Sequence, residues 1–192
     1  MPLQNRVTPF STIQADPARG MFMGNRGCLH GEHRNLEVEH TREKRWLVCL
    51  TSFKGRKRRI MQPGHYTELF FLDEATALAA GHRPCAECRR QAYDLFLKLY
   101  PGRRANAETL DKYLASDRLR PWPATFSELP EGAMFAIDTE AFVKWRGKAW
   151  RWHHAGYTPA EIPTGTVEVL TPEGTVAALA AGYKPVVHAS AR

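Results

Sequence analysis

Two cysteines in this 192-residue chain, Cys85 and Cys88, have a spacing that suits metal chemistry. A turn and the start of a helix are expected around them, and the free N–H groups of such a turn stabilise thiolate charge. Two thiolates two residues apart can bind one metal ion. Four cysteines in the whole chain are too few for a disulfide scaffold. The pair therefore predicts half of a structural zinc site.

Zinc takes four ligands, drawn here from thiolate and imidazole. Cys28, His30 and His33 lie in a glycine-rich segment, residues 24–33, and glycine lets a backbone turn tightly around a ligand. Cys49 lies within an apolar run, where a buried structural cysteine is the commoner outcome. The predicted ligand set is Cys28, His30, Cys85 and Cys88, with His33 or Cys49 as alternates. Buried or free thiols remain the alternative for Cys28 and Cys49.

The elements that would position these ligands can be read from local signals. Residues 67–72 favour a strand, Asp73 is a plausible helix N-cap, and Gly81 and Pro84 end the helix that follows. Strands are also expected over 21–23 and 46–53, the latter continuing through a turn into a basic return strand at 56–61. Helices are expected over 86–100 and over 106–119.

The rest of the chain contains short elements. Residues 1–20 are expected to be an irregular lead-in, and the proline-rich stretch 120–132 a linker. Short strands are expected over 133–137, 141–145, 149–152 and 167–172, before a last helix. The predicted fold class is α+β, a small antiparallel sheet with short helices around a zinc site followed by a β-rich unit that ends in a helix. The predicted domains are 1–120 and 121–192.

The last helix repeats part of the stretch that carries the cysteine pair. Residues 178–185, Ala-Leu-Ala-Ala-Gly-Tyr-Lys-Pro, match residues 77–84, Ala-Leu-Ala-Ala-Gly-His-Arg-Pro. Val186 and Ala189 stand where the first copy has its cysteines. Either the match is a chance similarity between two alanine-rich helix ends, or the unit is a scaffold that is separable from metal binding.

Charge points to a second kind of chemistry. Lysine and arginine number 27 against 20 aspartate and glutamate, a net charge of +7 with a pI near 9.4, which favours polyanions as partners. The predicted nucleic-acid-binding residues are Lys54, Arg56, Lys57, Arg58, Arg59, Arg89, Arg90, Trp145, Arg146, Lys148, Trp150 and Arg151. Cations follow phosphates, and tryptophan faces stack on unpaired bases. The tryptophan segment is equally typical of an ordinary half-buried hairpin with its charged face in solvent.

The stretch 67–90 resembles a known family. Phe-Phe-Leu-Asp-Glu-Ala-Thr-Ala-Leu-Ala-Ala-Gly-His-Arg-Pro-Cys-Ala-Glu-Cys, residues 70–88, is similar to the second half of the zinc-binding domain of Ada-like methylphosphotriester-repair proteins. The resemblance implies that Cys85 and Cys88 are zinc ligands and that the Gly27-Cys28 loop bears another. That family has a second cysteine four residues after its first, whereas this chain has Glu32 there. The resemblance thus implies the zinc fold better than it implies methyl transfer.

These observations favour a binding protein over an enzyme. We expect a zinc-binding protein, associated with nucleic acid and more specifically with DNA, that serves in DNA repair or transcription regulation. The alternatives are a methyl-accepting repair enzyme that uses Cys28, and a protein-interaction module. His153 and His154 point to opposite faces of a strand, so they are poor joint ligands. No N-terminal apolar segment or run of roughly 18 apolar residues is present, which predicts a cytoplasmic protein without a membrane span.

Overall fold

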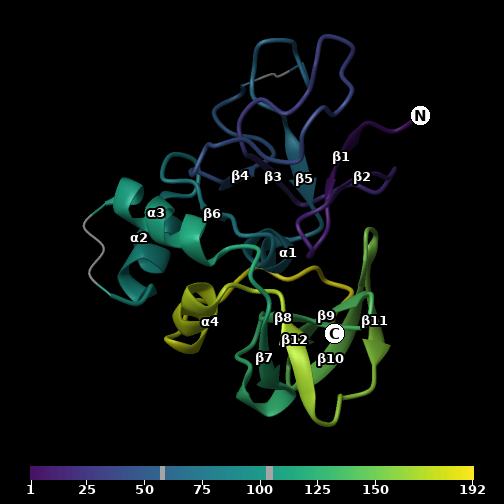
Figure 1. The fold of residues 1–192 in the computed structure, drawn as a ribbon, viewed down its shortest axis with the longest axis vertical. Coiled ribbons are helices and arrows are strands. Elements are labelled where there is room, and N and C mark those ends of the chain that lie inside the picture. The colour runs from purple at the N-terminus through teal and green to yellow at the C-terminus, as the bar shows by residue number, and fades with distance from the viewer. Residues whose placement is uncertain (57–58, 103–105) are drawn as a thin grey trace.

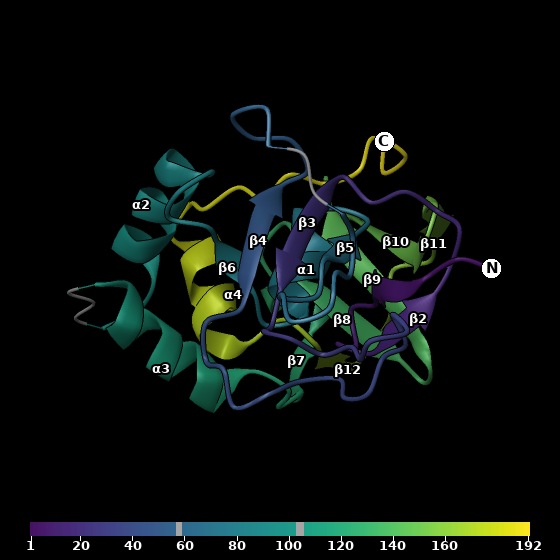
Figure 2. The same ribbon diagram turned by 90° about the horizontal axis from the view of Figure 1, so that it is seen from above.

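A computed structural model describes residues 1–56, 59–102 and 106–192, and it has the predicted α+β class. Within those residues there are two six-stranded sheets and four α-helices. Figure 1 shows the two sheets one above the other, with α1 between them and α2, α3 and α4 gathered at one side. Figure 2, seen from above, places the same three helices beside the first sheet.

The first sheet has the strand order β2-β1-β5-β3-β4-β6. Its strands are β1 (Gln4–Val7), β2 (Ile13–Ala15), β3 (Phe22–Asn25), β4 (Leu47–Leu50), β5 (Leu69–Phe71) and β6 (Arg83–Pro84). The prediction of an irregular segment over 1–20 is wrong, because these residues form β1 and β2. The return strand expected over 56–61 is also absent among the described residues of that segment. The strand before it, β4, pairs with β3 and β6 instead. Lys57 and Arg58 lie outside the described part of the chain.

The second sheet has the strand order β11-β10-β9-β8-β12-β7. Its strands are β7 (Trp122–Thr125), β8 (Met134–Ile137), β9 (Glu140–Trp145), β10 (Lys148–His153), β11 (Gly156–Ala160) and β12 (Thr166–Val169). A 3₁₀ turn, η1 (Phe126–Glu128), follows β7. The stretch 120–132, expected as a linker, therefore contains an edge strand that pairs antiparallel with β12. Pro123 within this strand does not prevent the pairing, since an edge strand tolerates proline.

The helices are α1 (Glu74–Ala79), α2 (Arg90–Leu99), α3 (Ala107–Asp117) and α4 (Glu173–Ala180). Asp73 caps α1 through a hydrogen bond from Thr76 N, and Asn106 caps α3 through one from Thr109 N, as both sequence signals predict. α2 starts later than the expected residue 86, because residues 86–89 form a turn. That turn brings Cys88 back toward Cys85.

The repeated stretch ends both of its helices in the same way. In the first copy Gly81 has φ +80° and His82 N donates to Ala77 O; in the second, Gly182 has φ +112° and Tyr183 N donates to Ala178 O. A six-to-one bond after a left-handed glycine is the Schellman helix end. The sequence repeat is thus a repeated helix terminus, whereas only the first copy continues into a strand, β6.

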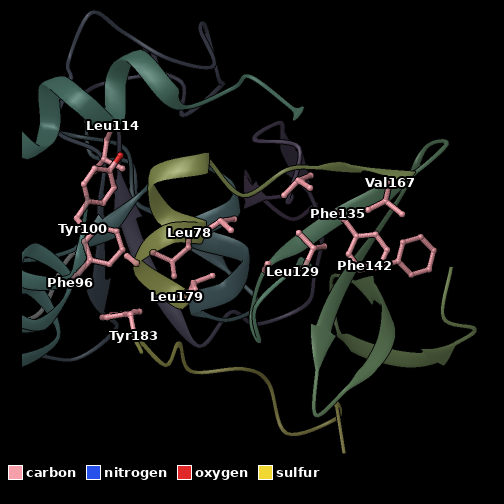
Figure 3. Packing of buried hydrophobic residues seen from close by; sticks show 14 of the residues in the cluster. Leu78, Phe96, Tyr100, Leu114, Leu129, Phe135, Phe142, Val167, Leu179 and Tyr183 are labelled. Carbon is pink, nitrogen blue, oxygen red and sulfur yellow. The ribbon is translucent and has the colours of Figure 1, made fainter. Parts of the chain in front are cut away.

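The largest hydrophobic cluster draws side chains from both sides of the predicted boundary at residue 120. Figure 3 shows Leu78 of α1, Phe96 of α2 and Leu179 of α4 in this cluster with Phe135 and Val167 of the second sheet. Burial of such side chains stabilises the chain by roughly 1.5–3 kcal/mol each. This cluster therefore spans the predicted boundary, whereas two smaller clusters draw only on residues before it.

Two buried carboxylates at the start of α1 tie the C-terminal segment to the first half of the chain. Asp73 accepts hydrogen bonds from Tyr157 Oη (2.8 Å) and His188 N (2.9 Å), and burial raises the pKa of its carboxyl group. Glu74 accepts one from Tyr183 Oη (2.5 Å) and forms an ion pair with Arg89 (2.8 Å). These contacts hold the helix that leads to the cysteine pair.

Candidate metal centre

Three cysteines meet at the edge of the first sheet. Cys49 is in β4, Cys85 directly follows β6, and Cys88 precedes α2. Their Sγ atoms all lie within 4.8 Å of one another. Zinc bonds thiolate sulfur at about 2.3 Å, so sulfur atoms on one tetrahedral ion are about 3.8 Å apart, a separation compatible with this cluster.

The parallel pairing of β4 with β6 brings Cys49 to the pair. Val48 is in register with Pro84, and Cys85 N donates a hydrogen bond to Val48 O (3.0 Å), so the next residues along the two strands, Cys49 and Cys85, become neighbours. Proline has no N–H to donate, which is tolerated here because β6 is an edge strand of two residues. The third thiol follows from the turn at 86–89, closed by Arg89 N to Cys85 O (3.1 Å).

Backbone N–H groups point at two of the sulfur atoms. Glu87 N donates to Cys85 Sγ and Leu50 N donates to Cys88 Sγ, each at 3.4 Å. Hydrogen bonds to the charged form of a group favour that form. The backbone here is therefore arranged to stabilise thiolates, the form in which cysteine binds metals.

The three thiols differ in how readily they lose their protons. A hydrogen bond from the Cys49 thiol, with further donors from the backbone of Cys88 and Glu87, lowers the pKa of Cys85 to about 5 although burial opposes this. The same hydrogen bond, together with burial, raises the pKa of Cys49. Burial raises the pKa of Cys88. A metal ion would displace the remaining protons and so bind more tightly as pH rises.

Apolar side chains enclose one side of the cluster. Met23 of β3 is the cross-strand partner of Cys49 and is buried against Cys49 and Cys85, with Leu47 and Phe70 packed beside them. A row of neighbouring residues thus crosses one face of the sheet through Phe70, Met23 and Cys49. These apolar side chains exclude water from the side of the thiol cluster that faces the protein interior.

A buried ion pair holds β6 in place. Arg83 donates from Nε and Nη2 to the two carboxylate oxygens of Asp111 in α3, at 2.7 and 2.8 Å, and its Nη1 donates to Pro84 O (3.0 Å). The two side chains are only 2% and 8% exposed. Arg83 lies two residues before Cys85, so α3 helps to fix the position of one of the three clustered thiols.

The other predicted ligands lie elsewhere. Cys28 is exposed and its thiol contacts His30 O at 3.7 Å; the buried His30 ring contacts Thr67 Oγ1 (2.6 Å) and Gln62 O (3.2 Å). His33 is exposed. The loop after β3 is pinned by Thr67 N donating to Gly27 O (2.9 Å), and within the described chain neither Cys28 nor His30 belongs to the thiol cluster. The preference for them over Cys49 is thus reversed. The methyl-accepting role assigned to Cys28 stays a prediction.

The sequence offered only a weak signal for Cys49. The run around it predicted a strand, and this is confirmed by β4. Its pairing partner is the two-residue strand β6, which no local pattern marks as a strand.

The basic residues predicted to bind nucleic acid divide into exposed and buried sets. Lys54, Arg56 and Arg59 are exposed, and Arg56 Nη2 pairs with Glu87 Oε1 at 2.6 Å. Arg90 is exposed and pairs with Asp94 (2.9 Å). The prediction that Arg89 binds nucleic acid is wrong, because its side chain is only 8% exposed and forms an ion pair with Glu74.

The tryptophan segment forms the β9–β10 hairpin. Trp150 is buried in the core and donates from Nε1 to Trp145 O (3.0 Å), so its predicted role in stacking on bases is wrong. Arg146 and Lys148 are exposed at the turn, and Arg151 pairs with Glu140 (2.9 Å). The alternative interpretation, a half-buried hairpin with a charged outer face, describes this segment.

Among the described residues, no helix is both long and apolar enough to cross a membrane.

The comparisons with known proteins add no assignment. No protein-family model, curated protein or solved structure matches the chain. The chemical interpretation of this protein consequently depends on the three clustered thiols.

Proposed function

We propose that this protein binds one zinc ion through the thiolates of Cys49, Cys85 and Cys88. The observation that carries the proposal is the meeting of three Sγ atoms within 4.8 Å of one another. The backbone N–H groups aimed at Cys85 and Cys88 support it, because they stabilise the charge that metal binding requires. Thiolate ligands select zinc and other soft metals over magnesium or calcium.

The ion would have a structural role. Its three ligands come from β4, from the segment after β6 and from the turn before α2, so binding would fasten the edge of the first sheet to the helices. Zinc at 100 times its dissociation constant should raise the free energy of unfolding by about 2.7 kcal/mol.

Matched cysteine variants test this proposal. Cys49→Ser should lower zinc affinity by at least about 100-fold, because losing a direct ligand exceeds the 10- to 100-fold effect of losing an outer partner. Cys28→Ser is the control and should keep one zinc per chain. Competition with a chromophoric chelator gives the affinities. Equal loss in the two variants, or zinc binding that survives Cys49→Ser, contradicts the proposal.

A second candidate function is association with nucleic acid, more specifically DNA. It is favoured by the exposure of Lys54, Arg56 and Arg59 on one segment, because exposed cations attract phosphates. The Arg56–Glu87 ion pair holds this segment beside the turn that carries Cys88. The excess of seven positive charges attracts polyanions over the whole surface.

Salt dependence tests the second candidate. If three phosphates are contacted, changing Lys54, Arg56 and Arg59 together to glutamine should reduce the slope of log affinity against log salt by about 3, at about 0.9 per contact. Changing the exposed Arg146 and Lys148 of the β9–β10 hairpin to glutamine is the control and should leave the slope near that of the native protein. Fluorescence anisotropy with a duplex DNA gives both slopes. Identical slopes for the triple variant and the native protein would remove the basic segment from the proposal.

A further inference from the structure

The thiol cluster supplies three ligands to an ion that takes four. In the described chain no further cysteine, histidine or carboxylate joins the group. Residues 57–58 and 103–105, outside that part, are lysine, arginine and alanine by sequence, and none of these residue types is a usual zinc ligand in proteins. Glu87, between two of the cysteines, pairs with Arg56 instead. The fourth position therefore has no candidate among the usual side-chain ligands.

The uncovered side of the cluster lies at Cys88. Cys49 and Cys85 are buried and Met23 packs against them, whereas Cys88 is only half buried. A solvent-open cavity of about 340 Å³ lies there, lined by Leu50, Cys88, Arg90 and Gln91 among others. A ligand from solution can approach the ion from this side.

The surroundings of the open position suit a sulfur donor. Zinc with three thiolates has a charge of 2 − 3 = −1, and a fourth thiolate would bring it to −2, so the setting must tolerate negative charge. The N–H donors of Glu87 and Leu50 provide for this. Arg56 and Arg90 are close by, each paired with a carboxylate, Glu87 and Asp94 respectively. Four-thiolate zinc is a standard protein arrangement.

We infer that the fourth coordination position is open toward the Cys88 cavity and takes the thiolate of a low-molecular-weight thiol. The inference rests on the proposed metal site. In the binding step the thiol S–H bond breaks, its proton passes to solvent, and a sulfur–metal bond forms as water leaves the ion. Nothing is oxidised or reduced.

Cobalt(II) substitution under anaerobic conditions tests the inference. Glutathione is the probe, and S-methylglutathione, which cannot form a thiolate, is the matched control. Sulfur-to-cobalt charge-transfer absorbance should rise by about one third, since the ion goes from three thiolates to four. The rise should saturate at one glutathione per cobalt, and the S-methyl compound should produce none.

Three results would overturn the inference. The first is an unchanged spectrum with glutathione, and the second is cobalt that leaves the protein for the free thiol and passes an ultrafiltration membrane. The third concerns Met23: if Met23→Leu alters the thiol-free spectrum and only this variant responds to glutathione, the Met23 thioether occupies the position in the native protein. A protein that binds no cobalt at all would defeat the proposed function, whereas cysteine-dependent cobalt that ignores glutathione defeats only this inference.

Discussion

Replacing Asp111 with alanine removes the carboxylate partner of a guanidinium group that is buried two residues before Cys85. Arg83 and Asp111 make two hydrogen bonds of 2.7 and 2.8 Å, with side chains 2% and 8% exposed. Without Asp111 the hydrogen-bond acceptor that remains for Arg83 among the described residues is Pro84 O, at 3.0 Å. Breaking a buried pair by removing one partner costs about 3–5 kcal/mol, since an uncompensated charge remains in the interior.

Asp94→Ala is the matched control, because it also removes an aspartate from an arginine pair. Arg90 and Asp94 lie one helical turn apart at 2.9 Å, but their side chains are 69% and 52% exposed. Such a surface pair contributes about 0.3–0.5 kcal/mol. Urea unfolding of the metal-free proteins, followed by tryptophan fluorescence, should separate the two variants by more than 2 kcal/mol.

A difference below about 1 kcal/mol between the two variants would refute the reasoning, since it would mean that burial does not raise the cost. The double variant Arg83→Met with Asp111→Leu distinguishes lost charge compensation from lost packing. Apolar replacement of both partners of a buried pair is often neutral, so the double variant should recover most of the stability. Asp111→Ala should also weaken zinc binding, because Arg83 positions Cys85.

Two further predictions concern the helix end that precedes the cysteine pair. Burial, and then neighbouring guanidinium groups, lower the pKa of His82 well below 6.5, so its side chain stays neutral in the folded state while it gains a proton in the unfolded state as pH falls below about 6.5. The free energy of unfolding should therefore fall by up to about 1.4 kcal/mol per pH unit below that pH. Urea unfolding should show a flatter slope for His82→Gln, with His33→Gln as the control. At the repeated helix ends both glycines have positive φ, but an added Cβ at Gly81 would lie 2.7 Å from Arg118 Cβ while one at Gly182 meets nothing within 4 Å. Gly182→Ala should thus cost about 1 kcal/mol of backbone strain, and Gly81→Ala clearly more, as measured by thermal unfolding.

The sequence alone determined the features that depend on neighbours in the chain. Asp73, Asn106 and Gly81 act on backbone groups a few residues away, so the starts and ends of their helices could be predicted. The spacing of Cys85 and Cys88 likewise identified two of the three clustered thiols. Alternating β-forming residues marked most strands of the second sheet.

Only the tertiary structure decided which distant segments meet. Cys49 joins the cluster because β4 pairs with a strand two residues long, and pairing between segments more than 30 residues apart leaves no local pattern. The sequence also could not show which basic side chains are buried. Arg89 and Arg90 are adjacent, yet Arg89 is buried in an ion pair with Glu74 while Arg90 faces solvent. A side chain's type and spacing specify what chemistry it can do, whereas its partners depend on strand pairing and packing across the whole chain.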